Sequence, residues 1–191
     1  MGFGNWFKSA LSFLGLYKKK ATIVFVGLDN AGKSTLLAML KNSATTTVAP
    51  TQQPTSQELV MGSIRFKTFD LGGHEVARQL WEQYVTNSDG IVFLVDSADP
   101  SRFEESRRTL QELLDNHDLA TTPILILSNK VDIQTAVSME TMVQSFGIQH
   151  LLTGKGGSKL RSDQRPLEVF PCSVINRFGY TDGFKWLSKY L

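Results

Sequence analysis

Eight consecutive residues near the start of the chain have the composition of a phosphate-binding loop. Gly27 to Ser34 read Gly-Leu-Asp-Asn-Ala-Gly-Lys-Ser, which matches the pattern Gly-x4-Gly-Lys-Ser/Thr. The glycines let backbone N–H groups surround phosphate oxygens, and the start of the following helix adds partial positive charge. Lys33 is expected to reach the outer phosphates of a nucleotide, and the Ser34 hydroxyl is expected to bind Mg²⁺.

A second polar group, Asn129-Lys130-Val131-Asp132, follows an apolar run at residues 124–127. A carboxylate can accept two hydrogen bonds from one face of guanine, where adenine offers no matching pair of donors. Asp132 is therefore predicted to select the base, while Asn129 and Lys130 hold the ring and the loop. This group disfavours a P-loop ATPase or a small-molecule kinase.

A third pattern, Asp70-Leu-Gly-Gly73, is weak when taken alone, because Asp-x-x-Gly occurs by chance in most chains. Its position between the other two motifs makes it a strong indication of a nucleotide site. Asp70 is predicted to hold Mg²⁺ through water, and the Gly73 N–H to sense the γ-phosphate.

Apolar runs and helical patterns alternate along the chain and must position these residues. We expect strands at 22–27, 58–61, 64–70, 90–96, 123–129 and 167–173, and helices at 33–42, 102–116, 138–146 and 180–191. Residues 153–165 are polar and glycine-rich, which predicts a loop. This alternation predicts an α/β fold: a mostly parallel six-stranded sheet with helices on both faces. Ligands on such sheets bind at the carboxyl ends of the strands.

The composition is that of one ordinary globular domain, with 191 residues, 41% hydrophobic and 20% charged. A single cysteine, Cys172, excludes an internal disulfide and points to a reducing compartment. The net charge of +2 is too balanced to indicate a nucleic-acid partner. The apolar runs are far shorter than the roughly 20 residues of a membrane-spanning helix.

The first 19 residues differ from the rest and are predicted to form an N-terminal amphipathic membrane-binding segment, ahead of a domain at 20–191. On a helical wheel its apolar residues gather on one side, and three lysines follow at 18–20. A signal peptide is excluded because no cleavage pattern is present. A helix packed permanently on the core remains the alternative. The residues predicted to enter the membrane are Phe3, Trp6, Phe7, Leu11 and Leu14.

The three motifs, in their order along the chain, resemble those of small GTPases. Further stretches resemble the Sar family of Arf-related GTPases, which start COPII coat assembly. The matching stretches are residues 13–19, 27–37, 54–56, 70–75, 90–96, 123–127 with 129–130, 153–156 and 168–174. The loop at 153–156 and the histidine after Asp-Leu-Gly-Gly are similar to Sar rather than Arf. Trp6 stands where a myristoylation motif needs Ser or Thr, so we expect no acyl chain on Gly2.

The resemblance implies roles for further residues. His74 stands where most small GTPases carry the glutamine that orients the attacking water. Thr51, rather than Thr55, takes the Mg²⁺-binding role, although Gln52-Gln53 departs from the family pattern. Residues 172–174 resemble the last guanine motif, whose backbone N–H groups face the base oxygen. The residues predicted to bind GTP are Asp29, Asn30, Ala31, Gly32, Lys33, Ser34, Thr35, Gly73, Asn129, Lys130, Asp132, Ser173 and Val174.

The same resemblance implies a switch: the N-terminal helix packs on the protein with GDP and enters the endoplasmic reticulum (ER) membrane with GTP. Implied partners are GTP and GDP, ER membrane lipids, a membrane-bound exchange factor and COPII inner-coat subunits. The inner coat would act as GTPase-activating protein (GAP) by supplying an arginine. The expected location is cytoplasmic, peripheral on the ER membrane and ER-derived vesicles. Two alternatives stay open: an Arf-like GTPase with a lipid anchor at another endomembrane, and a nucleotide-binding scaffold without turnover.

Overall fold

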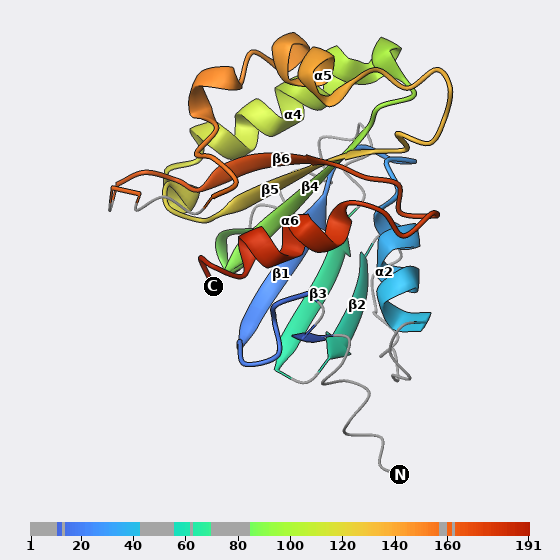
Figure 1. The fold of residues 1–191 in the computed structure, drawn as a ribbon. Coiled ribbons are helices and arrows are strands. Elements are labelled where there is room, and N and C mark those ends of the chain that lie inside the picture. Colours follow the sequence, from blue (N-terminus) through green and yellow to red (C-terminus); the bar gives the residue numbers. More distant parts are fainter. Residues whose placement is uncertain are drawn as a thin grey trace.

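A twisted six-stranded sheet forms the centre of the computed structural model, which describes residues 11–12, 14–42, 56–61, 63–69, 85–156, 160–161 and 163–191 (Figure 1). Its strands lie in the order β2-β3-β1-β4-β5-β6. β2 and β3 form an antiparallel pair, and all the other pairs are parallel. The bounds are β1 Ala21–Val26, β2 Ser56–Met61, β3 Ile64–Phe69, β4 Gly90–Asp96, β5 Ile124–Asn129 and β6 Leu167–Pro171.

Helices cover both faces of this sheet (Figure 1). α2 (Lys33–Asn42) and α6 (Tyr180–Leu187) pack on one face, and α4 (Phe103–Asp115) and α5 (Met139–Phe146) pack on the other. Three short 3-10 turns lie within the described part of the chain: η1 Pro100–Arg102, η2 His117–Leu119 and η3 Gln149–Leu151. The predicted α/β architecture is confirmed.

Burial on both faces explains why the central strands are almost wholly apolar. In β4, Val92 and Leu94 join the core under α2 and α6, whereas Ile91, Phe93 and Val95 join the core under α4 and α5. Successive side chains point to opposite faces of a strand, so a continuous apolar run fills both cores at once. The carboxyl ends of β1, β4 and β5 are thereby fixed side by side.

Several predicted bounds differ from those in the structure at their ends. The strand predicted at 167–173 ends at Pro171, because residues 172–174 leave the ladder: the Cys172 carbonyl accepts from Val131 N, and Ser173 pairs with Phe178. The helix predicted to 191 ends at Leu187. There the Ser188 hydroxyl donates to Lys185 O, and the N–H groups of Lys189 and Tyr190 donate to carbonyls three residues back instead of four.

The helix predicted from residue 138 begins at Met139, because Ser138 is its N-cap and accepts a 3.1 Å hydrogen bond from Thr141 N. The helix predicted at 102–116 covers Phe103–Asp115 and is preceded by η1. Neither shift changes which face of the sheet the helix covers.

The described part of the N-terminal segment packs against the domain. Leu11, Leu14 and Leu16 are buried in the same core as α2 and α6. The Lys19 ammonium donates a 2.6 Å hydrogen bond to Leu191 O. Residues 1–10, which include Phe3, Trp6 and Phe7, lie outside the described residues. Within the part that is described, no helix is long and apolar enough to span a membrane.

Candidate nucleotide site

The loop between β1 and α2 has a backbone that requires its glycines. Gly27 and Gly32 have φ angles of 133° and 104°, which L side chains rarely adopt. A Cβ at Gly27 would collide with Leu94 O, and one at Gly32 would collide with the Asn129 side-chain amide. Asn30 has a φ of 61°, a region that asparagine tolerates. The loop therefore lies directly against β4 and β5, as a phosphate-binding turn must.

Lys33 begins α2 and its side chain is buried, with 2% of the residue exposed. Its ammonium donates hydrogen bonds of 2.8 Å to Gly27 O and 2.6 Å to Leu28 O. These carbonyls hold the positive charge under the loop. Ser34 and Thr35 follow in the first turn of α2 and are exposed.

Asn129, the last residue of β5, joins three segments. Its side-chain N–H donates to Ala31 O at 2.9 Å, while its Oδ1 accepts from Val174 N at 3.1 Å. The Cys172 thiol also points to Oδ1, at 3.5 Å, and burial raises the pKa of this thiol to about 12. Asn129 thus links the phosphate loop to the segment after β6, which agrees with the predicted loop-holding role. The predicted contact of Asn129 with the base stays a prediction.

Lys130 is held by a carboxylate at the end of β4. Its ammonium lies 2.7 Å from Asp96 Oδ2, and Asp96 Oδ1 accepts from Ala98 N at 3.0 Å. The Lys130 φ of 66° is uncommon for a side chain of this size and occurs mainly where function requires it. Nearby, Ser97, the residue after β4, shares a buried 2.6 Å hydrogen bond with the hydroxyl of Ser128 in β5.

Two hollows meet at these loops and share Gly32, Thr35 and Lys130. The first lies over the phosphate loop, where Asn30, Lys33 and Ser34 complete its lining. The second is completed by Asn129, Asp132, Ile133, Val174 and Ile175. Site residues that the sequence predicts around position 30 and from position 129 onward thus lie along two adjoining hollows, which together form one depression. The Lys33 ammonium and the Ser34 hydroxyl lie at one end of it, and the exposed Asp132 lies at the other.

The last predicted guanine motif has a different hydrogen-bond pattern from the one expected. Ser173 N donates to Phe178 O at 3.1 Å, and Val174 N donates to Asn129 Oδ1. Both N–H groups are therefore used within the protein rather than turned toward a base oxygen. Val174 still lines the second hollow, beside Asp132 and Ile175.

Four predicted site residues cannot be placed by geometry. Thr51, Asp70, Gly73 and His74 lie outside the described residues. The predictions made for them therefore rest on the sequence alone.

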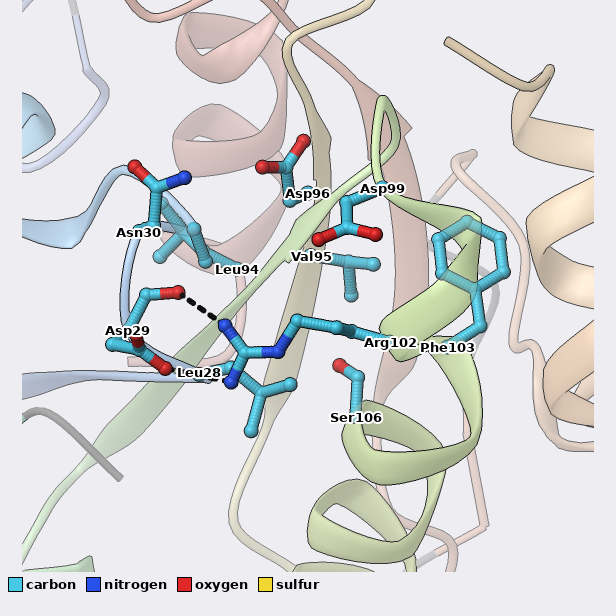
Figure 2. Close-up of a pocket in the computed structure, with 11 residues that line it drawn as sticks. Leu28, Asp29, Asn30, Leu94, Val95, Asp96, Asp99, Arg102, Phe103 and Ser106 are labelled. Carbon is cyan, nitrogen blue, oxygen red and sulfur yellow. Dashed lines mark hydrogen bonds and ion pairs between the residues drawn. The ribbon is translucent and has the colours of Figure 1, made fainter. Parts of the chain in front are cut away.

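Sequence reasoning missed Arg102 and Asp96, which surround the loops. Arg102 contacts Asp29 in the phosphate loop (Figure 2). Asp96 holds Lys130. Both lie at or shortly after the carboxyl end of the apolar run at 90–96. Parallel sheets bind ligands at the carboxyl ends of their strands, so this position is the sequence signal that could have identified them.

A mostly parallel sheet with a phosphate loop after its first strand and an Asn-Lys-x-Asp loop at the end of its fifth defines a P-loop nucleotide-binding protein. The family model described as the ADP-ribosylation factor family matches residues 7–191, and the chain belongs to this family. It is accordingly a small GTPase, an enzyme that hydrolyses GTP.

Three relatives match along nearly the whole chain. The chain is 99% identical over 191 residues to a small COPII coat GTPase SAR1 of Giardia intestinalis, covering 100% of both chains. It is 42% identical to a protein of the same description from Nicotiana tabacum, covering 98% of each. It is 36% identical to the small COPII coat GTPase SAR1B of Dictyostelium discoideum, over 97% of this chain and 94% of the relative.

Proposed function

We propose that this GTPase starts the assembly of the COPII coat on the ER membrane, for transport from the ER to the Golgi, and that its N-terminal segment enters the membrane when GTP is bound. The support is twofold. Relatives matched over 94% or more of their length are described as small COPII coat GTPases. The observation that carries the nucleotide part is the continuous depression from Lys33 to Asp132.

In this proposal GTP lies along that depression. Its phosphates face the loop N–H groups of residues 29–32, the Lys33 ammonium and the first turn of α2, where the helix terminus favours negative charge. Its base lies between Lys130 and Ile175, with Asp132 accepting two hydrogen bonds from guanine. Asn129 and Lys130 keep this floor in place through Ala31 and Asp96.

The residues fit a bound Mg²⁺. Ser34 offers an exposed hydroxyl beside Lys33 in the phosphate hollow, and small hard cations prefer oxygen ligands. In the proposal, Thr51 would supply a further oxygen ligand, and Asp70 would hold the ion through water. When bound, the ion neutralises charge on the β- and γ-phosphates.

Hydrolysis requires a water molecule placed in line with the γ-phosphorus. His74 in its neutral form accepts a hydrogen bond from this water and orients it, and Gly73 N–H contacts the γ-phosphate. The water oxygen bonds to phosphorus as the bond from phosphorus to the β–γ bridging oxygen breaks. GDP leaves with that oxygen, and the two protons of the water pass to the new phosphate and to solvent. Arg102, which touches the phosphate loop, is engaged with Asp29 and Glu105, so we assign the charge-stabilising arginine to a GAP acting in trans.

The packed N-terminal segment is the state we assign to GDP. Leu11 and Leu14 contact the core there, which hides the apolar face from a membrane. Release of the segment would expose these leucines, which would then act in the membrane with Phe3, Trp6 and Phe7, the residues predicted from the sequence to enter it. Lys18 and Lys20 are already exposed and would face anionic lipid headgroups.

Flotation with liposomes tests the proposal. The full chain is mixed with anionic liposomes in GDP or in a non-hydrolysable GTP analogue, with and without purified COPII inner-coat subunits. We expect flotation with the analogue, little with GDP, and co-flotation of the inner coat only in the analogue sample. Equal flotation in both nucleotides would contradict the switch. Flotation without coat recruitment would favour the Arf-like alternative, and an intact mass that includes an acyl chain would establish its lipid anchor.

A further inference from the structure

A carboxylate lies within the phosphate-binding loop itself. Asp29 is the third residue of the loop, four positions before Lys33. A negative charge at this place opposes the binding of a nucleotide phosphate, because like charges repel over such short distances. Its neighbours therefore decide whether the loop can hold an anion.

Arg102, the last residue of η1, reaches across to this carboxylate (Figure 2). Its Nη2 lies 2.6 Å from Asp29 Oδ1, and its Nη1 donates to the backbone oxygen of Asp29 at 3.4 Å. One guanidinium thus binds both the side chain and the main chain of a single loop residue. This geometry fixes the loop as well as its charge.

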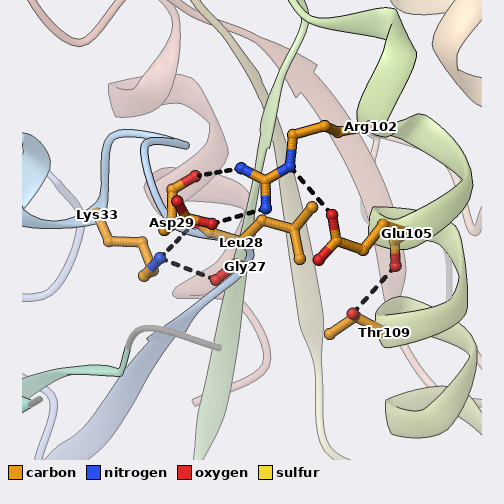
Figure 3. A network of polar contacts seen from close by, with 7 residues as sticks. All are labelled: Gly27, Leu28, Asp29, Lys33, Arg102, Glu105 and Thr109. Atoms are coloured by element: carbon orange, nitrogen blue, oxygen red, sulfur yellow. Dashed lines mark hydrogen bonds and ion pairs between the residues drawn. The ribbon is translucent and has the colours of Figure 1, made fainter. Parts of the chain in front are cut away.

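The guanidinium is itself held in place by α4, the helix that follows Arg102. Arg102 Nε donates to Glu105 Oε2 at 3.0 Å, and Thr109 Oγ1 donates to Glu105 O at 3.1 Å (Figure 3). On the opposite side of the loop, Lys33 holds Gly27 O and Leu28 O in the same view. Two cations therefore fix the loop, one from α2 and one from the start of α4.

The Arg102–Asp29 ion pair has apolar side chains on one side and solvent on the other. Leu28, Leu94 and Phe103 line the small cavity beside it, which limits water on that side. The side chains remain 33% exposed at Arg102 and 60% exposed at Asp29. The hydrogen bond from Arg102, opposed by desolvation and helped by its charge, lowers the pKa of Asp29, so the carboxylate is ionised at neutral pH. Solvent screening keeps the expected effect moderate.

We propose that Arg102 is a positioning residue for the nucleotide: it neutralises the Asp29 carboxylate and fixes the loop backbone, so that the loop can retain the phosphates of a guanosine diphosphate or triphosphate. This role rests on the proposed nucleotide site. Arg102 does not touch the reacting atoms; it acts through Asp29.

The test measures the release of fluorescently labelled GDP from the full chain at fixed Mg²⁺. Arg102→Gln is expected to release GDP about fivefold faster than the parent. The matched control is Arg108→Gln, which removes an arginine paired with Glu104 on the exposed side of α4 and is expected to release GDP at the parent rate. Raising the salt concentration should reduce the difference between Arg102→Gln and the parent, because the effect is electrostatic.

A double variant separates charge neutralisation from packing. Asp29→Asn/Arg102→Gln removes both charges, while the long 3.4 Å hydrogen bond to Asp29 O is lost in both variants. Because neutralising the carboxylate is the main part of the proposed role, the double variant is expected to release GDP more slowly than Arg102→Gln, close to the parent rate. If Arg102→Gln does not fold, the double variant alone decides: release near the parent rate supports the proposal, and release fivefold faster or more overturns it. Equal rates for Arg102→Gln and the parent also overturn it. A parent that retains no guanine nucleotide would instead overturn the proposed function.

Discussion

Asn129 donates a 2.9 Å hydrogen bond to Ala31 O across 98 positions of sequence, and through it β5 supports the phosphate loop. The same side chain accepts from Val174 N. The base-side and phosphate-side loops thus share one buried amide. A change at this residue acts on both ends of the nucleotide site.

Asn129→Ala should therefore weaken GDP and GTP to a similar degree. Removing the amide leaves Ala31 O and Val174 N without this partner, at a cost of about 1–3 kcal/mol. Nucleotide release rates and thermal unfolding of the GDP-bound protein measure the effect. Asn176→Ala, at an exposed position in the following turn, is the control. A variant that loses affinity for only one of the nucleotides would contradict the shared support.

Asp132→Asn should change the base preference. The amide replaces one hydrogen-bond acceptor with a donor, which costs about 1–3 kcal/mol with guanine and suits xanthine. Competition binding of GTP and xanthosine triphosphate measures the change. Asp163→Asn, where the exposed carboxylate pairs with Arg161, should leave the preference as it is. Parent-like binding of GTP by Asp132→Asn would remove Asp132 from the base site.

Ser34→Asn should shift the protein toward GDP. The larger amide displaces the hydroxyl proposed to bind Mg²⁺, and GTP depends on that ion more than GDP does. Affinities for both nucleotides, measured with Mg²⁺ and with excess chelator, test this. Ser101→Asn, at an exposed position in η1, controls for the added bulk. An equal loss for GDP and GTP would argue against the metal role.

His74→Gly should retain nucleotide while slowing GAP-stimulated hydrolysis by about a hundredfold, because the group that orients water is lost. Phosphate release in the presence of the inner coat measures the rate. The exposed His117 and His150 provide matched histidine-to-glycine controls. Unchanged stimulated turnover in His74→Gly would make this histidine an ordinary loop residue.

Leu16→Ala should release the N-terminal segment from the domain while GDP is still bound. Leu16 is fully buried with Leu11 and Leu14, and its truncation costs about 2–5 kcal/mol of packing. We expect a lower unfolding temperature of the GDP form and increased flotation of that form. Val60→Ala, at an exposed position on the edge strand, is the control. If GDP-state flotation does not rise, packing of this segment is not what restrains membrane binding.

The elements nearest the motifs were the most predictable from sequence. The bounds 33–42 and 90–96 agree with α2 and β4, because a phosphate loop fixes the start of a helix and a buried strand must be continuously apolar. Segment ends elsewhere depended on hydrogen bonds that no pattern displays, such as the one from Ser188 to Lys185 O.

The residues that support the site from behind were less predictable from the sequence. Arg102 and Asp29 are far apart in sequence and meet because β1 and β4 are neighbours in the sheet. The sharing of one amide among Ala31, Val174 and Cys172 likewise arises from tertiary packing. Motif spacing identified the groups that face the nucleotide, while the groups behind them required the fold.

The strand order has a consequence for how the protein folds. β1 lies between β3 and β4, and β5 joins the sheet only through β4 and β6, so each pairing that builds the site except the β2–β3 hairpin joins distant parts of the chain. Such long-range parallel pairings form slowly, because a large loop must close before any contact is gained. The phosphate loop gains its support from Asn129 only after β5 has docked. Capture of nucleotide during synthesis would therefore mark chains in which β5 has already paired with β4.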